Sequence, residues 1–127
     1  DPGFGINITK KLKPFIFHTD TIYNFPQGVH IDGAKTIYGN YLNYDIAVEY
    51  FLPNRFNLML EFNGFLQGDK KKAGERIPAS DISYLTIAPG IGWSNKRIQA
   101  LLAYQRTVTG TNTDANDSVV VTCVYTF

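Results

Sequence analysis

Apolar and polar side chains alternate along most of this 127-residue chain, and helical periodicity is scarce. Alternation at every second residue is the pattern of β-strands that have one apolar and one polar face. The pattern predicts seven strands, at residues 3–10, 14–25, 36–52, 56–67, 82–93, 98–109 and 118–127.

The third and fourth predicted strands show the two faces most clearly. In the third strand, the even positions from 38 to 52 are apolar or aromatic except Asn40, whereas the odd positions include Asn43, Asp45 and Glu49. In the fourth strand, the even positions are mostly large and apolar: Phe56, Leu58, Leu60, Phe62 and Leu66. Each strand therefore has one face suited to an apolar medium and one suited to water.

The connections between these strands alternate between short and long. The short connections cover residues 11–13, 53–55 and 94–97, and the long ones cover 26–35, 68–81 and 110–117. Short turns at one end and long polar loops at the other are typical of transmembrane barrels. We therefore expect an all-β fold, an antiparallel up-and-down transmembrane β-barrel, formed as a single domain over residues 1–127.

The positions of basic and aromatic residues support this expectation. All Lys and Arg residues except Arg106 lie in or beside the proposed turns and loops. A Lys or Arg that faces lipid at the bilayer midplane costs about 2–4 kcal/mol, which gives this distribution a physical cause. Aromatic residues of the apolar face gather near strand ends, as at a membrane interface; the candidates are Tyr50, Phe56, Trp93, Tyr104 and Tyr125.

Charge and composition argue against several other classes. A net charge of +1 gives no electrostatic reason to expect nucleic acid as a partner. No run approaches the roughly 18 consecutive apolar residues of a transmembrane helix. The single Cys123 leaves no internal disulfide and no metal cluster. No nucleophile elbow or triad spacing is present, so we expect no enzyme, cofactor or bound metal.

The chain ends in an alternating stretch with an aromatic last residue. Its apolar positions are Val119, Val121, Cys123, Tyr125 and Phe127. The stretch resembles the closing strand of bacterial outer-membrane β-barrels, whose C-terminal aromatic is recognised during insertion. The resemblance implies that Val121, Tyr125 and Phe127 form a C-terminal assembly signal, that outer-membrane lipid and the barrel-assembly machinery are partners, and that the protein is located in the outer membrane of a Gram-negative bacterial cell.

Two features depart from the simplest barrel. Pro89 removes a hydrogen-bond donor from the ladder, so we expect a bulge or bend there, beside Gly90 and Gly92. Seven is an odd number, whereas bacterial single-chain barrels have an even number of strands. A periplasmic Phe127 would place Asp1 on the extracellular side, and the chain opens without a signal peptide. Either the pattern misses an eighth strand, or the chain is the C-terminal part of a larger, even-stranded barrel, which is the reading we favour.

Several longer motifs occur in order along the chain: Leu12–His18, Ile22–Pro26, Tyr44–Arg55, Leu60–Gly64, Ile87–Trp93 and Tyr125–Phe127. Together they resemble the MetA-pathway of phenol degradation family of outer-membrane transporters. The resemblance covers nearly the whole chain and implies a channel for small, often hydrophobic, molecules. Barrels of that family are longer than this chain, which again indicates missing strands.

The polar strand face holds the candidate lumen-lining and selectivity residues, Asp45, Glu49, Glu61, His18 and Asp20. If the 53–55 turn is the hairpin pivot, Ala47 lies opposite Glu61, and Asp45 and Glu49 are its diagonal neighbours. Such a patch favours cations or binds a hard ion like Ca²⁺. Alternatively, and as the reading we favour, the carboxylates pair with Lys or Arg from strands outside this chain.

Three other groups have both a chemical and a plain interpretation. His18 and Asp20 suit a base and its orienting acid, although polar lumen lining is the commoner role of such a pair. The run Lys70–Lys72 is either a solvated loop or a contact for lipopolysaccharide phosphates. Cys123 shares the parity of the apolar face, where it serves as a small apolar residue.

Three functions are compatible with these patterns. The first is an outer-membrane, porin-like channel for the transport of small molecules, with Asp45, Glu49 and Glu61 tuning its lumen. The second is an outer-membrane barrel scaffold that encloses or anchors a partner protein. The third is a soluble barrel with the apolar face inward, binding a hydrophobic ligand. The first is the leading reading, and the placement of the basic residues and the terminal aromatic count against the third.

Overall fold

The computed structural model describes residues 1–31 and 33–126, and in them the fold is all-β and antiparallel. A seven-stranded sheet follows chain order, with each strand paired to the next: β1 (Gly3–Leu12), β2 (Phe15–Asn24), β5 (Tyr41–Phe51), β6 (Phe56–Gln67), β9 (Ile82–Ser94), β10 (Ile98–Thr111) and β11 (Asp117–Tyr125). The predicted strands are confirmed to within a few residues at most ends. Phe127 lies outside the described residues, so the structure gives no account of the terminal aromatic.

The predicted third strand, 36–52, is wrong in one respect, because the structure divides it at residues 38–40. The outer piece is β4 (Ala34–Ile37) and the inner piece is β5. A side chain at Gly39 would overlap the backbone of Gly68, and the Gly68 N–H donates to the Asn40 carbonyl at 3.1 Å. The two segments therefore meet backbone to backbone at Gly39 and Gly68, and this contact interrupts both strands of the hairpin.

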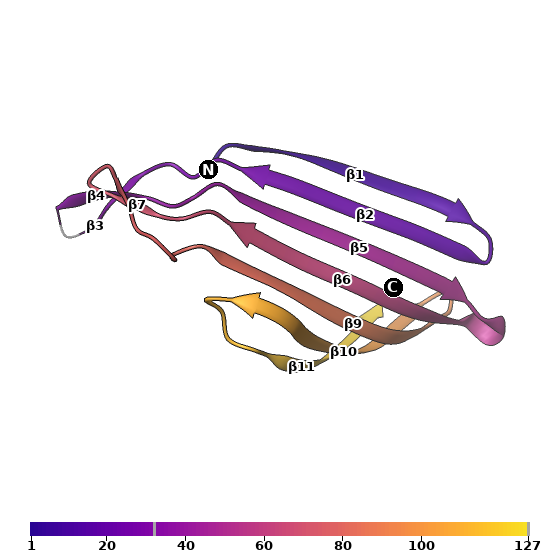
Figure 1. Cartoon of the computed structure of the whole chain (residues 1–127). Helices are drawn as coiled ribbons and strands as arrows, with labels where there is room; N and C mark the ends of the chain where they lie inside the picture. The colour runs from indigo at the N-terminus through magenta and orange to yellow at the C-terminus, as the bar shows by residue number, and fades with distance from the viewer. Residues whose placement is uncertain (32, 127) are drawn as a thin grey trace.

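Beyond this break, two of the long connections form a second, four-stranded sheet that the sequence did not predict. Its order is β3 (Val29–Ile31), β4, β7 (Lys71–Lys72) and β8 (Glu75–Arg76). The pair Ile37↔Lys71 in this sheet continues the register of Tyr41↔Gln67 in the larger sheet. The small sheet is thus an outward extension of the β5–β6 hairpin, and it lies at the left-hand end of Figure 1.

The short turns lie at the opposite end of the strands. One of them is a single turn of 3₁₀ helix, η1 (Pro53–Arg55), in which Asn54 has φ of 62°. In the next, the Asn95 side chain accepts hydrogen bonds from the backbone N–H groups of Arg97 and Ile98, at 2.8 and 2.7 Å. Within the described ranges, the chain has no helix long and apolar enough to cross a bilayer.

The last strands of the larger sheet are strongly curved, whereas β1, β2, β5 and β6 lie side by side in one layer (Figure 1). A bulge predicted at Pro89 is not found there, because the register between β9 and β10 is the same at Gly90↔Ala103 and at Ile87↔Arg106. The register shift lies further along, between Thr107 and Thr109, opposite Thr86 and Leu85. Pro89 has no N–H to offer β10, while its pairing with Leu60 of β6 is uninterrupted.

The sheet is open along both edges. In the described residues, β1 pairs only with β2, and β11 pairs only with β10, so no ladder joins the two ends into a closed barrel. The fold also has almost no apolar interior, since Ala88 is the one hydrophobic residue buried in the described part of the chain. A single-layer sheet of this kind must cover its apolar face with something other than itself.

Candidate functional site

In a soluble barrel the apolar face is buried and the polar face is exposed, whereas in this sheet the apolar face is the more exposed one. Along β6, the apolar positions are mostly exposed and the polar positions are mostly half-buried. Leu58, for example, is 44% exposed, and on the far strands Val121 is 73% exposed. The polar face is therefore the inner, concave face of the curl, and the apolar face is the outer, convex one.

The candidate residues of the concave face lie on three neighbouring strands. His18 and Asp20 are on β2, Asp45 and Glu49 are on β5, and Glu61 is on β6. All five point to the same face because they share strand parity and register. The predicted register is confirmed, since Ala47 lies directly opposite Glu61, with Asp45 and Glu49 as the diagonal neighbours.

Asn63 lies at the centre of this polar face. Its side-chain amide donates to Asp45 Oδ1 at 2.6 Å and to Glu61 Oε1 at 2.7 Å. The Asn63 Oδ1 atom accepts a hydrogen bond from the Thr86 hydroxyl at 3.3 Å, and Thr86 in turn accepts from Gln105 at 3.3 Å. A chain of hydrogen bonds thus crosses four strands, from β5 to β10, and holds two carboxylates on one neutral amide.

The predicted pairing of His18 with Asp20 is not the one that the structure forms. Asp20 accepts a hydrogen bond from the Asn7 amide at 3.0 Å. His18 instead lies between the Thr9 hydroxyl, 3.0 Å from Nδ1, and Glu49 Oε1, 3.5 Å from Nε2. The Thr9 hydroxyl, His18 and Glu49 thus lie in one row across β1, β2 and β5.

The carboxylates of the concave face have neutral or weakly basic partners. In the residues that the structure describes, no Lys or Arg forms an ion pair with Asp45, Glu49 or Glu61. Nor do any three His, Cys, Asp or Glu side chains of residues 1–31 and 33–126 gather in a way that could hold a metal ion. Asp45, Glu49 and Glu61 are called the acidic belt below; their carboxylates are hydrogen-bonded and half-buried.

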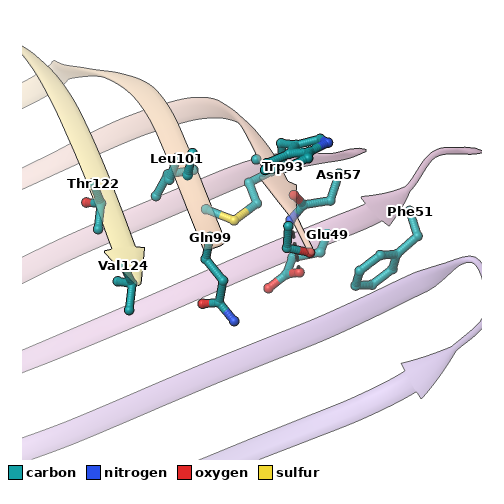
Figure 2. Close-up of a pocket in the computed structure, with 12 residues that line it drawn as sticks. Glu49, Phe51, Asn57, Trp93, Gln99, Leu101, Thr122 and Val124 are labelled. Atoms are coloured by element: carbon teal, nitrogen blue, oxygen red, sulfur yellow. Dashed lines mark hydrogen bonds between the residues drawn. The ribbon is translucent and has the colours of Figure 1, made fainter. Parts of the chain in front are cut away.

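A hollow of about 340 Å³ lies on the concave face near the short turns. Figure 2 shows Glu49 of β5, Gln99 of β10 and Thr122 of β11 on one side of the curled strands. The Asn57 amide donates to Glu49 Oε2 at 3.3 Å, so this carboxylate joins the belt to the hollow. A second hollow, of about 550 Å³, lies near the long loops at the other end of the face.

No protein-family model matches this chain, and neither does any curated protein sequence. The resemblance to the phenol-degradation transporter family therefore stays a prediction.

Most of the predicted interface aromatics lie at one height of the convex face, beside the short turns. Tyr50 packs against Phe15 with ring centroids 5.0 Å apart, and Phe56 is the register partner of Trp93. Tyr125 pairs with Ile98 at the same end. Tyr104 lies further along β10 towards the long loops, opposite Val119.

Sequence reasoning missed a second aromatic group at the loop end. The Phe4, Tyr23 and Phe25 rings contact one another at centroid distances of 4.9–6.1 Å. The clue was that Phe4 and Tyr23 share the apolar face at the ends of adjacent predicted strands. The convex face therefore carries aromatic residues at both ends.

The remaining predicted positions of the convex face lie on β11. Val121 is opposite Leu102, and Cys123 is opposite Ala100 with its thiol free and exposed. Of the three residues of the expected assembly signal, Val121 and Tyr125 are therefore on the convex face, and Phe127 lies outside the described residues.

Asp69 organises the long loop that follows β6. Its carboxylate pairs with Arg76 and accepts hydrogen bonds from the backbone N–H groups of Ser80 and Asp81, both at 3.0 Å. The hydrogen bond from Arg76 is the main reason why the pKa of Asp69 lies below its ordinary value, and the two backbone donors act in the same direction. The Asn112 amide ties the third long loop to this one by donating to the carbonyl of Asp81 at 2.7 Å.

The lysine run of this loop is divided between two environments. Lys70 places its ammonium 5.2 Å from the centre of the Tyr38 ring, which is a cation–π contact. Lys71 and Lys72 form β7 and are exposed. The run is thus partly structural, while its two last members are open to solvent.

Proposed function

We propose that this chain forms part of the wall of an outer-membrane β-barrel channel for small molecules, hydrophobic ones among them. The convex face would lie against lipid and the concave face would line the lumen. The single observation that carries this proposal is the inverted exposure of the two faces. Large contiguous apolar surfaces are rare on soluble proteins and mark contact with a membrane or a partner.

The size of the apolar face agrees with this proposal. On β6 it extends from Phe56 to Leu66. At about 3.3 Å per residue this is roughly 33 Å along the strand, or about 23 Å across a bilayer for a tilt near 45°. The apolar band of an outer-membrane barrel is about 25 Å tall. The charged residues of this face are Lys10, two residues before the end of β1, and the Arg106–Asp117 ion pair, in which Asp117 is the first residue of β11.

The topology supports closure by further strands. Seven antiparallel strands leave β1 and β11 running in the same direction. A ring that is antiparallel throughout then needs an odd number of additional strands, from the same polypeptide or from another. Such closure would also satisfy the unpaired backbone groups of both edges, which a lipid environment demands.

The acidic belt gives the channel a selectivity. Asp45, Glu49 and Glu61 hold negative charge on the concave face without a Lys or Arg partner among the described residues. Rings of carboxylates favour the passage of cations. We infer that this belt concentrates cations in the lumen and disfavours anions of similar size.

The first test uses membranes from cells that express the full-length gene, with gel mobility compared before and after boiling. A folded barrel resists detergent and shifts on boiling. In planar bilayers, the pore should pass K⁺ in preference to Cl⁻, and the variant with Glu49→Gln and Glu61→Gln should lose much of that preference. The single variants Glu49→Gln and Glu61→Gln are each compared with Glu75→Gln, which removes the same single charge from the exposed loop sheet. A protein that needs no detergent and shows no mobility shift would overturn the membrane location, and unchanged selectivity would overturn the role of the belt.

A further inference from the structure

Three aromatic rings form a ladder on the concave face, close to the long loops. The Tyr41 and Phe65 rings lie 5.6 Å apart, and the Phe65 and Tyr84 rings lie 5.3 Å apart and within 16° of parallel. They come from β5, β6 and β9, so each ring faces the ring of a neighbouring strand. Aromatic side chains on a polar, inward face are not explained by a lipid-facing role.

The ladder ends beside β10 because the residue opposite Tyr84 is Gly110. Among the described residues, Phe65 is the one aromatic ring that contacts Tyr84, so the ladder of rings ends there. The hollow of about 550 Å³ opens there, between Tyr84 and the loop that joins β10 to β11. The Thr113 side chain covers Gly110, where a Cβ would meet its methyl group, so the hollow lies between Tyr84 and this loop at the mouth of the concave face.

Polar groups surround this hollow. The backbone of Asn116 is fixed to Thr107 by two hydrogen bonds, of 2.9 and 3.2 Å, which hold the loop against the strand. The amide of Gln105 is anchored on Thr86 at 3.3 Å, with its carbonyl oxygen still available. Over the part of the chain that the structure describes, the Asp114 carboxylate and the Asn116 side-chain amide have no hydrogen-bond or ion-pair partner, although both line the hollow.

We propose that this hollow is a binding subsite for a small sugar, a polyhydroxylated ring with one flat apolar side. The apolar side of the ring stacks on Tyr84, at the edge of the hollow. Its hydroxyl groups donate to Asp114 and Gln105 and accept from Asn116. A plain hydrocarbon ring would also stack, but it would displace water from these polar groups without replacing its hydrogen bonds, which is costly.

This inference rests on the proposed channel only for the statement that the concave face is the lumen. Binding itself needs no membrane and no closed pore. If the concave face is the lumen, the subsite is an entry point for sugars, between the long loops and the acidic belt. It can therefore be tested on the full chain in detergent micelles, separately from conductance.

The experiment titrates methyl pyranosides of glucose, galactose and mannose against the folded protein and follows binding by saturation-transfer NMR. At least one should bind to the wild type with its ring protons nearest the protein. Tyr84→Leu should weaken binding about fivefold through loss of stacking, and Asp114→Ala about tenfold or more through loss of a charged hydrogen bond. Tyr104→Leu, the same substitution on the convex face, should leave binding unchanged.

Three results would overturn the inference. They are no binding of any pyranoside, equal binding by the wild type and both subsite variants, and displacement of the sugar by toluene at equal concentration. Asp114 lies in an exposed loop, so its variant remains informative if Tyr84→Leu does not fold. A channel that conducts but binds no sugar refutes the subsite alone, whereas sugar binding without conductance refutes the channel alone.

Discussion

Substitution of Asn63 should be the most damaging change on the concave face. The Asn63 amide is the shared donor for Asp45 and Glu61, at 2.6 and 2.7 Å. A hydrogen bond to a charged group contributes about 1.5–3 kcal/mol. The two bonds would give about 3–6 kcal/mol if the site were dry. Because these carboxylates are only half-buried and regain water when the amide is removed, we expect Asn63→Ala to lower the free energy of unfolding by about 2 kcal/mol.

The measurement is the temperature at which the folded, fast-migrating band disappears from an unboiled gel. A loss of about 2 kcal/mol corresponds to a fall of roughly 8 °C for a chain of this size. Asn63→Asp should fall further, because it replaces the donor with a third carboxylate at hydrogen-bond distance from the other two. The matched control is Asn43→Ala, since Asn43 shares the concave face and, within the described residues, makes no side-chain hydrogen bond. Equal falls for Asn63→Ala and Asn43→Ala would refute the view that the carboxylates depend on the shared amide.

Three further predictions concern other parts of the molecule. The pKa of Asp69 is lower in the folded protein than its ordinary 3.8, so the loop contacts are stabilising above that pH and are lost as the pH falls through the folded value; Asp69→Asn should therefore raise amide exchange at Ser80 at neutral pH, and unchanged exchange would contradict this. A Cβ at Gly64 would overlap the Tyr44 ring, so Gly64→Ala should cost about 1–3 kcal/mol in thermal unfolding, and the added change Tyr44→Ala should recover part of the loss if the clash is the cause. In reconstituted membranes, Cys123 should react with a lipid-soluble maleimide and not with a charged thiol reagent, as judged by mass spectrometry, and equal labelling would place the convex face in water.

The strands and the acidic belt could be predicted from the sequence for a simple reason. Alternation over ten or more residues is a strong signal, and the 53–55 turn fixes the register of the hairpin around it, so Ala47 could be placed opposite Glu61. The partner of His18 could not be found in the same way. Residues two apart on one strand are separated by nearly 7 Å, whereas Glu49 approaches His18 from the next strand.

The small sheet was not predicted, although part of its signal is local. Its two hairpins have two-residue connections with a glycine, Asp32-Gly33 and Ala73-Gly74, but strands such as β7, with two residues, are too short to show a period. The pairing of β4 with β7 is not local, since it forms where the β5–β6 hairpin brings two loops together. The aromatic ladder needed the same information, since Tyr41, Phe65 and Tyr84 meet only when the register of three strands is known.

Because the sheet has almost no interior, substitutions on its apolar face should cost less stability than substitutions in a globular core. In a globular core, trimming Leu to Ala costs about 2–5 kcal/mol because a cavity remains that neighbouring atoms cannot fill. On the convex face here, a residue such as Leu58 or Val121 projects outward from a single layer. In the proposed membrane location, lipid chains would close over the shortened side chain, so the cost would fall to the transfer of the missing groups, about 0.8 kcal/mol for each CH₂. One apolar residue on this face should therefore replace another at little cost. Related sequences would keep the alternation, the glycines and the acidic belt while differing at most other positions.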